Sequence, residues 1–424
     1  MVNATPANDG LLPHLFRIEY TKMTAVLCRV FGLKHIEIAE DIASETFLKA
    51  IEVWSLKGVP VNPTAWLYTV AKNKTKDCIK RNAFFEKEVR AAISPKEIQD
   101  DEPFIDFTEK NISDSQLEMI FVVCNPINSD EAQICLALQI LCGFSLEEIA
   151  DAFLSKKETI KKRVFRARDN LRNEKFKLPV LQPAEINSRL DSVLTVLYLL
   201  FNEGYFSRSN NKIIRKDLCL EAMRLTFTLV RNKLTDTPKV SALLALMCFQ
   251  SSRLDARMND LEDAILFDEQ DKQLWDKELI EKGNYYLAKA CSEKETSKYH
   301  IEASIAWWHT APNENNKWEN ILQLYNHLLL LEYSPMTALN RTFAFAKVHG
   351  NRQAIKEAKK VGLQSNHYYH SLLGFLYSGH DRNKAADHYT QSINLSNSAT
   401  EKRLLSKQID RLNEKTATDH YDPK

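Results

Sequence analysis

Two Ser-x-x-Glu sequences constrain the fold of this chain more than any other feature. Residues 145–172, "SLEEIADAFLSKKETIKKRVFRARDNLR", pair Ser145 with Glu148 and Ser155 with Glu158. In such a capping box, each side chain accepts a hydrogen bond from the other residue's backbone amide, and a helix starts there. Only a short turn fits between the two helices. This spacing predicts a helix-turn-helix motif.

The second of these helices is apolar on one face and basic elsewhere. Ile160, Val164, Ala167 and Leu171 recur at helical steps and predict the buried face. Residues 156–177 hold ten basic and three acidic residues, whereas the whole chain has 57 Lys+Arg and 56 Asp+Glu. For a charge run alone a solvated helix is the better interpretation, but the capping boxes and the one-sided charge favour DNA binding.

A recognition helix points its N-terminal side chains at base edges in the major groove, while its flanks contact phosphates. The predicted DNA-binding residues are Lys156, Lys157, Glu158, Thr159, Lys161, Lys162, Arg163 and Arg166. Arg168 and Arg172 are predicted to add phosphate contacts.

Composition bounds the rest of the chain. Ten Gly and thirteen Pro in 424 residues favour long helices and an all-α fold, and the length suggests several domains. Eight well-separated cysteines without a CxxC pair or a Cys/His cluster predict free thiols in a reducing cytoplasm, with no metal and no cofactor. Neither a signal peptide nor a membrane span is recognisable, so we expect a soluble, cytoplasmic protein that does not enter a membrane.

The N-terminal region is predicted to form helices, each with one apolar side. In "IAEDIASETFLKAIEVW" (38–54), Ile42, Thr46 or Phe47, Ala50 and Trp54 lie on one side. The next helix begins with Asn62 as a cap and Pro63 at its first position. Its other face is basic.

An acidic segment follows, and later a long helical region. Residues 95–119 contain eight acids and two lysines, which is typical of a linker. In the C-terminal region, two similar helical hairpins place Gly350 and Gly379 in their turns, 29 residues apart. Because tetratricopeptide repeats have a period of about 34 residues, this pattern indicates a degenerate array, which usually serves as an interaction surface.

Several segments resemble the extracytoplasmic-function (ECF) branch of the sigma-70 family. "AEDIASETFLKAI" and "PTAWLYTVAKNKTKDCIKR" resemble regions 2.2 to 2.4, and "FSLEEIADAFLSKKETIKKRVFRARDNLR" resembles region 4.2. "FVVCNP", "RLDSVLTVLYLLFNEGYFS", "DEQDKQLWD" and "SPMTALNRTFAFA" resemble the subgroup with a tetratricopeptide-like extension. The resemblance implies region 2 at 11–92, an acidic linker at 93–113, region 4 at 114–178 and a helical regulatory domain at 184–413.

The resemblance also implies partners and site residues. Region 2 would bind the clamp helices of the β′ subunit of core RNA polymerase through Asp41, Glu45 and Phe47. It would recognise the −10 promoter element through Trp66, Lys72, Asn73, Lys76, Asp77, Lys80 and Arg81. Residues 55–62 lie where relatives place a loop that captures a flipped base of that element. The helix-turn-helix would read the −35 element.

The C-terminal region is expected to regulate the sigma factor in cis, through an intramolecular contact or a regulatory protein. In "YLLFNEGYFS", the Asn-Glu-Gly sequence predicts a helix stop at Gly204, and the alternative assigns Asn202, Glu203 and Tyr205 to an interdomain contact. No motif for an enzyme is found, so we expect no catalytic activity. The alternative function is a stand-alone helix-turn-helix DNA-binding regulator that binds partners through its repeats.

Overall fold

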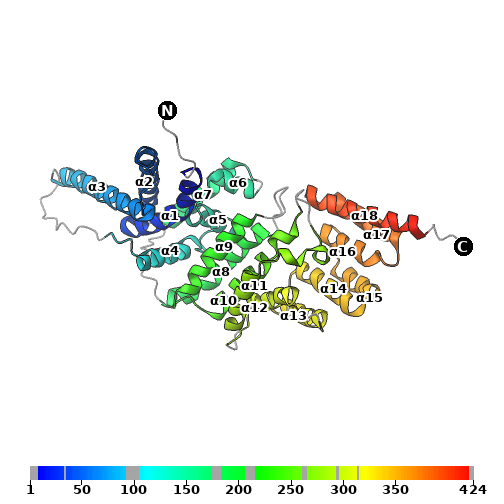
Figure 1. The fold of residues 1–424 in the computed structure, drawn as a ribbon. Coiled ribbons are helices and arrows are strands. Elements are labelled where there is room, and N and C mark those ends of the chain that lie inside the picture. The colour runs from blue at the N-terminus through cyan, green and yellow to red at the C-terminus, as the bar shows by residue number, and fades with distance from the viewer. Residues whose placement is uncertain are drawn as a thin grey trace. The chain divides into compact units, whose positions relative to one another are not determined.

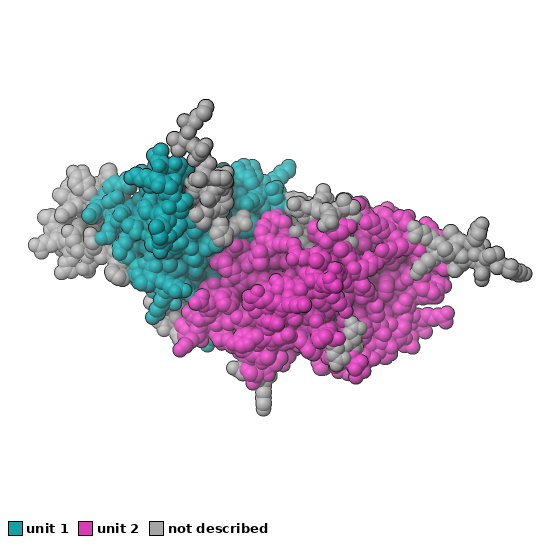
Figure 2. Space-filling view, in the orientation of Figure 1, with its two compact units in different colours: residues 1–197 teal, residues 198–424 magenta. Residues whose placement is uncertain are grey.

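The fold is helical and divides into two compact units (Figures 1 and 2). The structure, a computed structural model, describes residues 8–32, 35–91, 105–153, 155–173, 183–205, 215–259, 265–292, 296–312 and 315–419. Within these ranges it contains helices and no strand, which confirms the all-α class. Unit 1 comprises residues 1–197 and unit 2 residues 198–424, so the division falls inside helix α8.

Unit 1 begins with three helices that pack on one another. They are α1 (Asn8–Phe31), α2 (Ile36–Lys57) and α3 (Pro63–Ala91). The predicted apolar side of α2 is confirmed, because Ile42, Ala50 and Trp54 are buried. The predicted start of α3 is confirmed too, since the Ala65 amide donates to the Asn62 side chain at 3.0 Å. Most of the predicted acidic linker, residues 92–104, lies outside the described residues.

The second half of unit 1 contains the predicted helix-turn-helix. Its helices are α4 (Glu109–Val123), α5 (Asp130–Leu136), a π-helical continuation of α5 (Ala137–Leu141), α6 (Leu146–Ala152), α7 (Lys157–Asn173) and the first part of α8 (Pro183–Tyr205). The capping box of α6 is confirmed: the Glu148 amide donates to Ser145 Oγ at 3.2 Å and the Ser145 amide to Glu148 Oε2 at 2.8 Å. The second predicted capping box, Ser155 with Glu158, was placed one residue too early. A cap at Ser155 would start α7 at Lys156, but the helix starts at Lys157.

Unit 2 is a succession of helices, most of which pack on their neighbours in the chain. They are the end of α8, α9 (Lys216–Arg231), α10 (Pro238–Ser251), α11 (Lys277–Ala290), α12 (Lys298–Thr310), α13 (Lys317–Leu331), α14 (Pro335–His349), α15 (Asn351–Val361), α16 (His367–Tyr377), α17 (Arg382–Leu395) and α18 (Ala399–Asp419). Helix α10 is apolar on all sides and is buried by α9, α11 and α12, as expected for a central helix.

The two hairpins predicted near the C-terminus are present. Helices α14 and α15 form the first and meet at Gly350, whose φ is +85°; α16 and α17 form the second. Ala354 and Ala385, at matching positions of the two hairpins, are both fully buried. Their small side chains let the two helices of each hairpin approach closely.

Gly374 is required for the packing of the second hairpin. A Cβ at this position would lie 2.6 Å from the Tyr389 ring, which α17 packs against α16. We expect Gly374→Ala to lower the free energy of unfolding by about 1–3 kcal/mol, because the ring would have to move. Gly379→Ala is the matched control: its Cβ would meet open space, so urea unfolding should change by less than about 1 kcal/mol. Equal effects of the two substitutions would contradict this account.

The described residues also bear on the cysteine and membrane predictions. Every cysteine is a free thiol and most are buried, as predicted, although Cys291 is exposed. Among the helices of the described ranges, none is long and apolar enough to span a bilayer.

Candidate nucleic-acid and polymerase interface

The outward face of α7 carries a compact basic patch. Ile160, Val164, Ala167 and Leu171 are buried, as the periodicity predicted. The opposite face exposes Lys161, Lys162, Phe165 and Arg166, which we call the α7 patch. Lys161 and Phe165, Lys162 and Phe165, and Lys162 and Arg166 are neighbours on the helix surface because each pair is three or four positions apart.

Phe165 was missed by the sequence analysis. Its side chain is 65% exposed between two cationic residues of the α7 patch. It falls outside the apolar register of Ile160, Val164 and Ala167, and that mismatch was the available signal. An exposed apolar ring on a recognition helix can contact the methyl group of thymine in the major groove.

The N-terminal end of α7 is also exposed. Lys156, Lys157, Glu158 and Thr159 all face solvent there. Lys157 pairs with Glu147 of α6, and this hydrogen bond raises the pKa of Lys157 and lowers the pKa of Glu147. The pair joins the two helices of the motif at the end where a recognition helix meets bases.

Arg163 lies outside the α7 patch, contrary to its predicted place among the DNA-binding residues. Its half-buried guanidinium group is 2.8 Å from the Glu131 carboxylate of α5 and also reaches Cys135 Sγ. The side chain therefore fastens α7 to α5. In the sequence Arg163 cannot be told apart from Arg166, because both are basic residues off the apolar face.

Arg168 and Arg172 were predicted to contact phosphates, and this prediction needs correction. Both pair with carboxylates of α2. Arg168 donates to the two oxygens of Glu40 at 2.6 and 2.8 Å, and to Gln139 at 3.0 Å; Arg172 pairs with Glu37. These contacts tie α7 to the N-terminal three-helix bundle.

A second contact joins the same two halves of unit 1. The Arg29 side chain of α1 donates to Asn111 of α4 at 2.8 Å and lies 3.6 Å from the Glu118 carboxylate. Burial raises the pKa of Glu118, although Arg29 opposes this shift. The Tyr68 ring of α3 also stacks on Phe107, with ring centroids 4.8 Å apart. Unit 1 is therefore one packed body.

The predicted −10 residues form a stripe along α3. Lys72, Asn73, Asp77, Lys80 and Arg81 are exposed, and Lys76 is partly exposed. Lys72, Lys76 and Lys80 recur every four residues, so the structure brings them together on one side of the helix. Such a row of cations suits a nucleic-acid backbone.

Trp66 differs from the others in this group. Its ring packs edge-on against Trp54 at 5.4 Å between centroids, and the residue is half-buried. Trp54 itself is in the core. Much of the Trp66 ring is therefore used inside the bundle, which leaves only part of it for stacking on a base.

Of the three residues predicted to bind polymerase on α2, two are exposed and one is buried. Asp41 and Glu45 are exposed, although Glu45 also pairs with Lys74 at 2.6 Å. Phe47 is only 3% exposed and packs edge-on against Phe16 at 5.0 Å between ring centroids. It cannot be an exposed anchor, because α1 covers it.

Apolar side chains are nevertheless exposed on α2. Leu48 is 58% and Ile51 53% exposed, and both lie one or two turns beyond Glu45 on the helix surface. Leu56 and Val61, around the loop that follows, are almost fully exposed. Together with Asp41 and Glu45, Leu48 and Ile51 form what we call the α2 stripe.

The predicted helix stop at Gly204 falls one residue before the end of α8. The helix continues to Tyr205, and a Cβ on Gly204 would lie 2.8–2.9 Å from Arg215 and Cys219. Gly204 therefore permits a close approach of the chain to α8. Asn202 and Glu203 are half-buried, and their proposed interdomain role is untested.

Tyr205 is committed to the interior of unit 2. Its hydroxyl is 2.9 Å from a guanidinium nitrogen of Arg253, and Arg257 lies over its ring at 4.0 Å and donates to its carbonyl at 3.0 Å. The pKa of Tyr205 is lowered overall. Burial alone would raise it, but the nearby charges of Arg253 and Arg257 have the larger combined effect. The 3% exposed side chain is not available for an interdomain contact.

No group of three or more metal-ligating side chains occurs in the part of the chain that the structure describes. His367 and His370, three residues apart on α16, contact different partners. His367 lies 3.3 Å from the Glu401 carboxylate, and His370 faces His388 with 3.1 Å between their Nδ1 atoms.

Comparison with known proteins gives two family matches. The model of sigma-70 region 2 matches residues 15–85, which are most of α1 to α3. A family described as being of unknown function matches residues 189–291. No solved structure gives a significant match.

The chain therefore contains a sigma-70 region 2 domain, which supports membership of the sigma-70 family and a role in transcription initiation with core RNA polymerase and promoter DNA. It is similar along nearly its whole length to an uncharacterized protein of Rhizobium meliloti (strain 1021). The two are 31% identical over 399 residues, which cover 91% of this chain and 92% of the relative.

Proposed function

We propose that this protein is an ECF-type sigma factor that binds core RNA polymerase and directs promoter-specific initiation. One observation carries the proposal: unit 1 combines a region 2 match with a separate helix-turn-helix whose recognition helix exposes the α7 patch. A regulator that binds only duplex DNA needs no second module with its own basic stripe. The α7 patch would read the −35 element and the basic stripe of α3 the −10 element.

The α2 stripe is the proposed polymerase-docking surface. Its carboxylates can attract a basic partner, and its apolar side chains can be buried at the centre of the contact. Leu48 and Ile51 replace Phe47 as the apolar anchors, because they are exposed and Phe47 is not. Asp41 and Glu45 keep their predicted role.

We further propose that unit 2 regulates the factor in cis. It is a continuous helical array in the same chain, and arrays of this kind present large surfaces for partners. Its resemblance to tetratricopeptide repeats supports the same assignment. The following experiment measures whether unit 2 inhibits or activates the factor.

The decisive experiment is in vitro transcription with purified core polymerase, on the gene's own upstream DNA and on a pool of random promoters. The full chain is compared with a chain that ends at Tyr205, so that α8 and its contact from Arg189 to the Phe121 carbonyl remain. Promoter-dependent transcripts from either form are expected. The ratio between the two forms then gives the sign of control by the deleted helices.

If neither form binds core polymerase while the full chain still shifts duplex DNA, the sigma assignment fails. The stand-alone helix-turn-helix regulator would then replace it. Binding to core polymerase is therefore measured alongside transcription.

The α7 patch can be tested separately. We expect Lys162→Ala/Arg166→Ala to weaken promoter binding by about tenfold near 0.1 M salt, because two phosphate or base contacts are lost. The slope of log affinity against log salt should fall by about 2 for two lost phosphate contacts.

The control for this test is Lys233→Ala/Lys356→Ala, which removes two exposed cations from unit 2. It has the same effect on net charge and should leave binding unchanged. Equal losses in the two double variants would show that only the overall charge matters.

A further inference from the structure

A groove in unit 2 has the features of a small-molecule site. It encloses about 280 Å³ and lies between α14, α16 and α18, with one wall from α17. Ligand pockets typically have volumes of about 300–1,000 Å³, so this groove would fit a small ligand. All of its lining residues belong to unit 2.

The interior of the groove is apolar and rich in rings. Phe343 of α14 and Phe375 of α16 face each other with ring centroids 5.3 Å apart, and Met336 and Leu372 lie beside them. Among the described residues that line the groove, none has a charged side chain. The Lys347 ammonium group lies 5.3 and 5.8 Å from the centroids of these two rings, and its charge is paired with the Asp268 carboxylate at 3.4 Å.

The lining also includes three polar side chains. Asn340 of α14, Ser371 of α16 and Gln408 of α18 line the groove, and their side chains make no hydrogen bond to another described residue. An amide or hydroxyl group that faces a groove without a protein partner can exchange its water for a ligand. The groove therefore offers donors and acceptors at its edge and rings in its interior.

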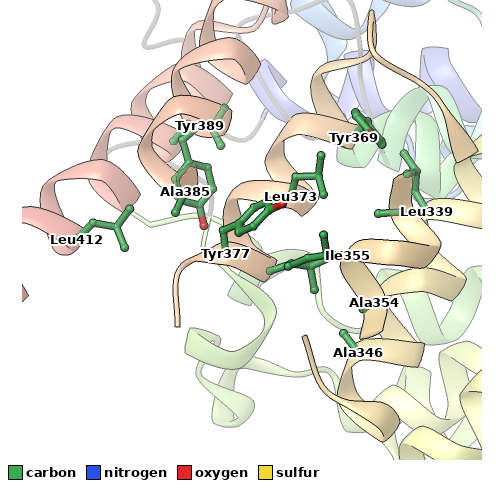
Figure 3. Packing of buried hydrophobic residues seen from close by; sticks show 13 residues of the cluster. Leu339, Ala346, Ala354, Ile355, Tyr369, Leu373, Tyr377, Ala385, Tyr389 and Leu412 are labelled. Carbon is green, nitrogen blue, oxygen red and sulfur yellow. The ribbon is translucent and has the colours of Figure 1, made fainter. Parts of the chain in front are cut away.

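The walls of the groove are held by the core beneath it. Leu339, Tyr389 and Leu405 line the groove and are also buried members of the cluster that joins α14 to α18; Figure 3 labels the first two. The Tyr389 ring packs directly against Gly374, so closely that a Cβ on Gly374 would clash with it. A groove with such walls is preformed, so a ligand would not have to open it.

We propose that this groove binds an uncharged small molecule with an apolar, ring-containing body and at least one hydrogen-bonding group. The charge of the ligand follows from the lining, because burying an ion without a partner is unfavourable. The ring-containing body follows from the aromatic interior, and the hydrogen-bonding group from Asn340, Ser371 and Gln408. This inference does not depend on the proposed sigma function.

The test uses the full chain and the uncharged fluorescent probe N-phenyl-1-naphthylamine. The probe should bind with enhanced fluorescence. Asn340→Trp and Ser371→Trp place a ring in the groove from positions that are not in the core, and each should weaken binding at least about tenfold. Gln391→Trp, an exposed position on α17 outside the groove, should leave binding unchanged.

Two further measurements keep the outcome decisive. At saturation the probe should slow hydrogen exchange in peptides from α14, α16 and α18 and leave peptides from α9 and α10 unchanged, which does not rely on the variants folding. The charged analogue 8-anilino-1-naphthalenesulfonate should bind at least about tenfold more weakly. No probe binding, or protection elsewhere in the chain, would overturn the site; equal binding of the two probes would overturn its preference for an uncharged ligand.

Discussion

Leu48→Asp/Ile51→Asp is expected to weaken binding to core RNA polymerase at least about 100-fold and to abolish promoter-dependent transcription. Each side chain is more than half exposed on α2, and an apolar anchor at the centre of an interface commonly contributes about 2 kcal/mol or more. An aspartate at the same place would have to be desolvated without a partner, which adds to the loss. Affinity for core polymerase is measured by equilibrium binding of a fluorescently labelled chain.

The control for this variant is Leu330→Asp/Leu331→Asp at the end of α13, where both side chains are also exposed. It introduces the same charges in unit 2 and should bind core polymerase normally. Duplex DNA binding through the α7 patch should persist in both variants, because α7 is unchanged. Normal polymerase binding by the α2 variant would show that the α2 stripe is not the docking surface.

Local features of the fold were predictable because their causes are local. The buried face of α7 and the cap of α3 depend on residues within a turn or two of each other, so periodicity and capping rules suffice. The same rules placed Trp54 in the core of unit 1. The resemblance to sigma-70 region 2 also rested on short, ordered sequence segments, and the family match at residues 15–85 confirms it.

Features that depend on distant parts of the chain were not predictable. Phe47 and Leu48 are adjacent apolar residues of α2, and only the position of α1 decides that the first is covered and the second exposed. Arg168 looked like Arg166 in sequence, yet its partner Glu40 is 128 residues away. At Gly204 the sequence predicted only a helix stop, whereas the glycine is also needed because the chain near Cys219 occupies the space beside the helix.

The candidate site was therefore predicted as a region and corrected in its members. The basic residues of α3 and α7 are on the expected helices, and most of them are exposed. Some residues that were predicted to contact DNA instead join two helices, such as Arg163 and Arg168. A charged residue that links two helices and one that contacts DNA have the same local sequence pattern.

Loss of the Arg168 side chain is expected to destabilise unit 1 by about 2–3 kcal/mol. Its two hydrogen bonds to Glu40 are bidentate, and the side chains are only 13% and 21% exposed. In Arg168→Met the Glu40 carboxylate would remain largely buried without its cation. A fully buried pair costs about 3–5 kcal/mol when one partner is removed, and the residual exposure of this one reduces the effect.

Hydrogen exchange in peptides from α2 and α7 of the full chain measures this change as the free energy of local opening. The control is Lys49→Met, because Lys49 pairs with Glu52 at 3.2 Å while both side chains are more than half exposed; this change should cost less than about 1 kcal/mol. Glu40→Met/Arg168→Met removes both charges together and should recover most of the loss, which isolates the coupling between the two residues. If Arg168→Met costs no more than Lys49→Met, the contact between α2 and α7 does not hold the two halves of unit 1 together.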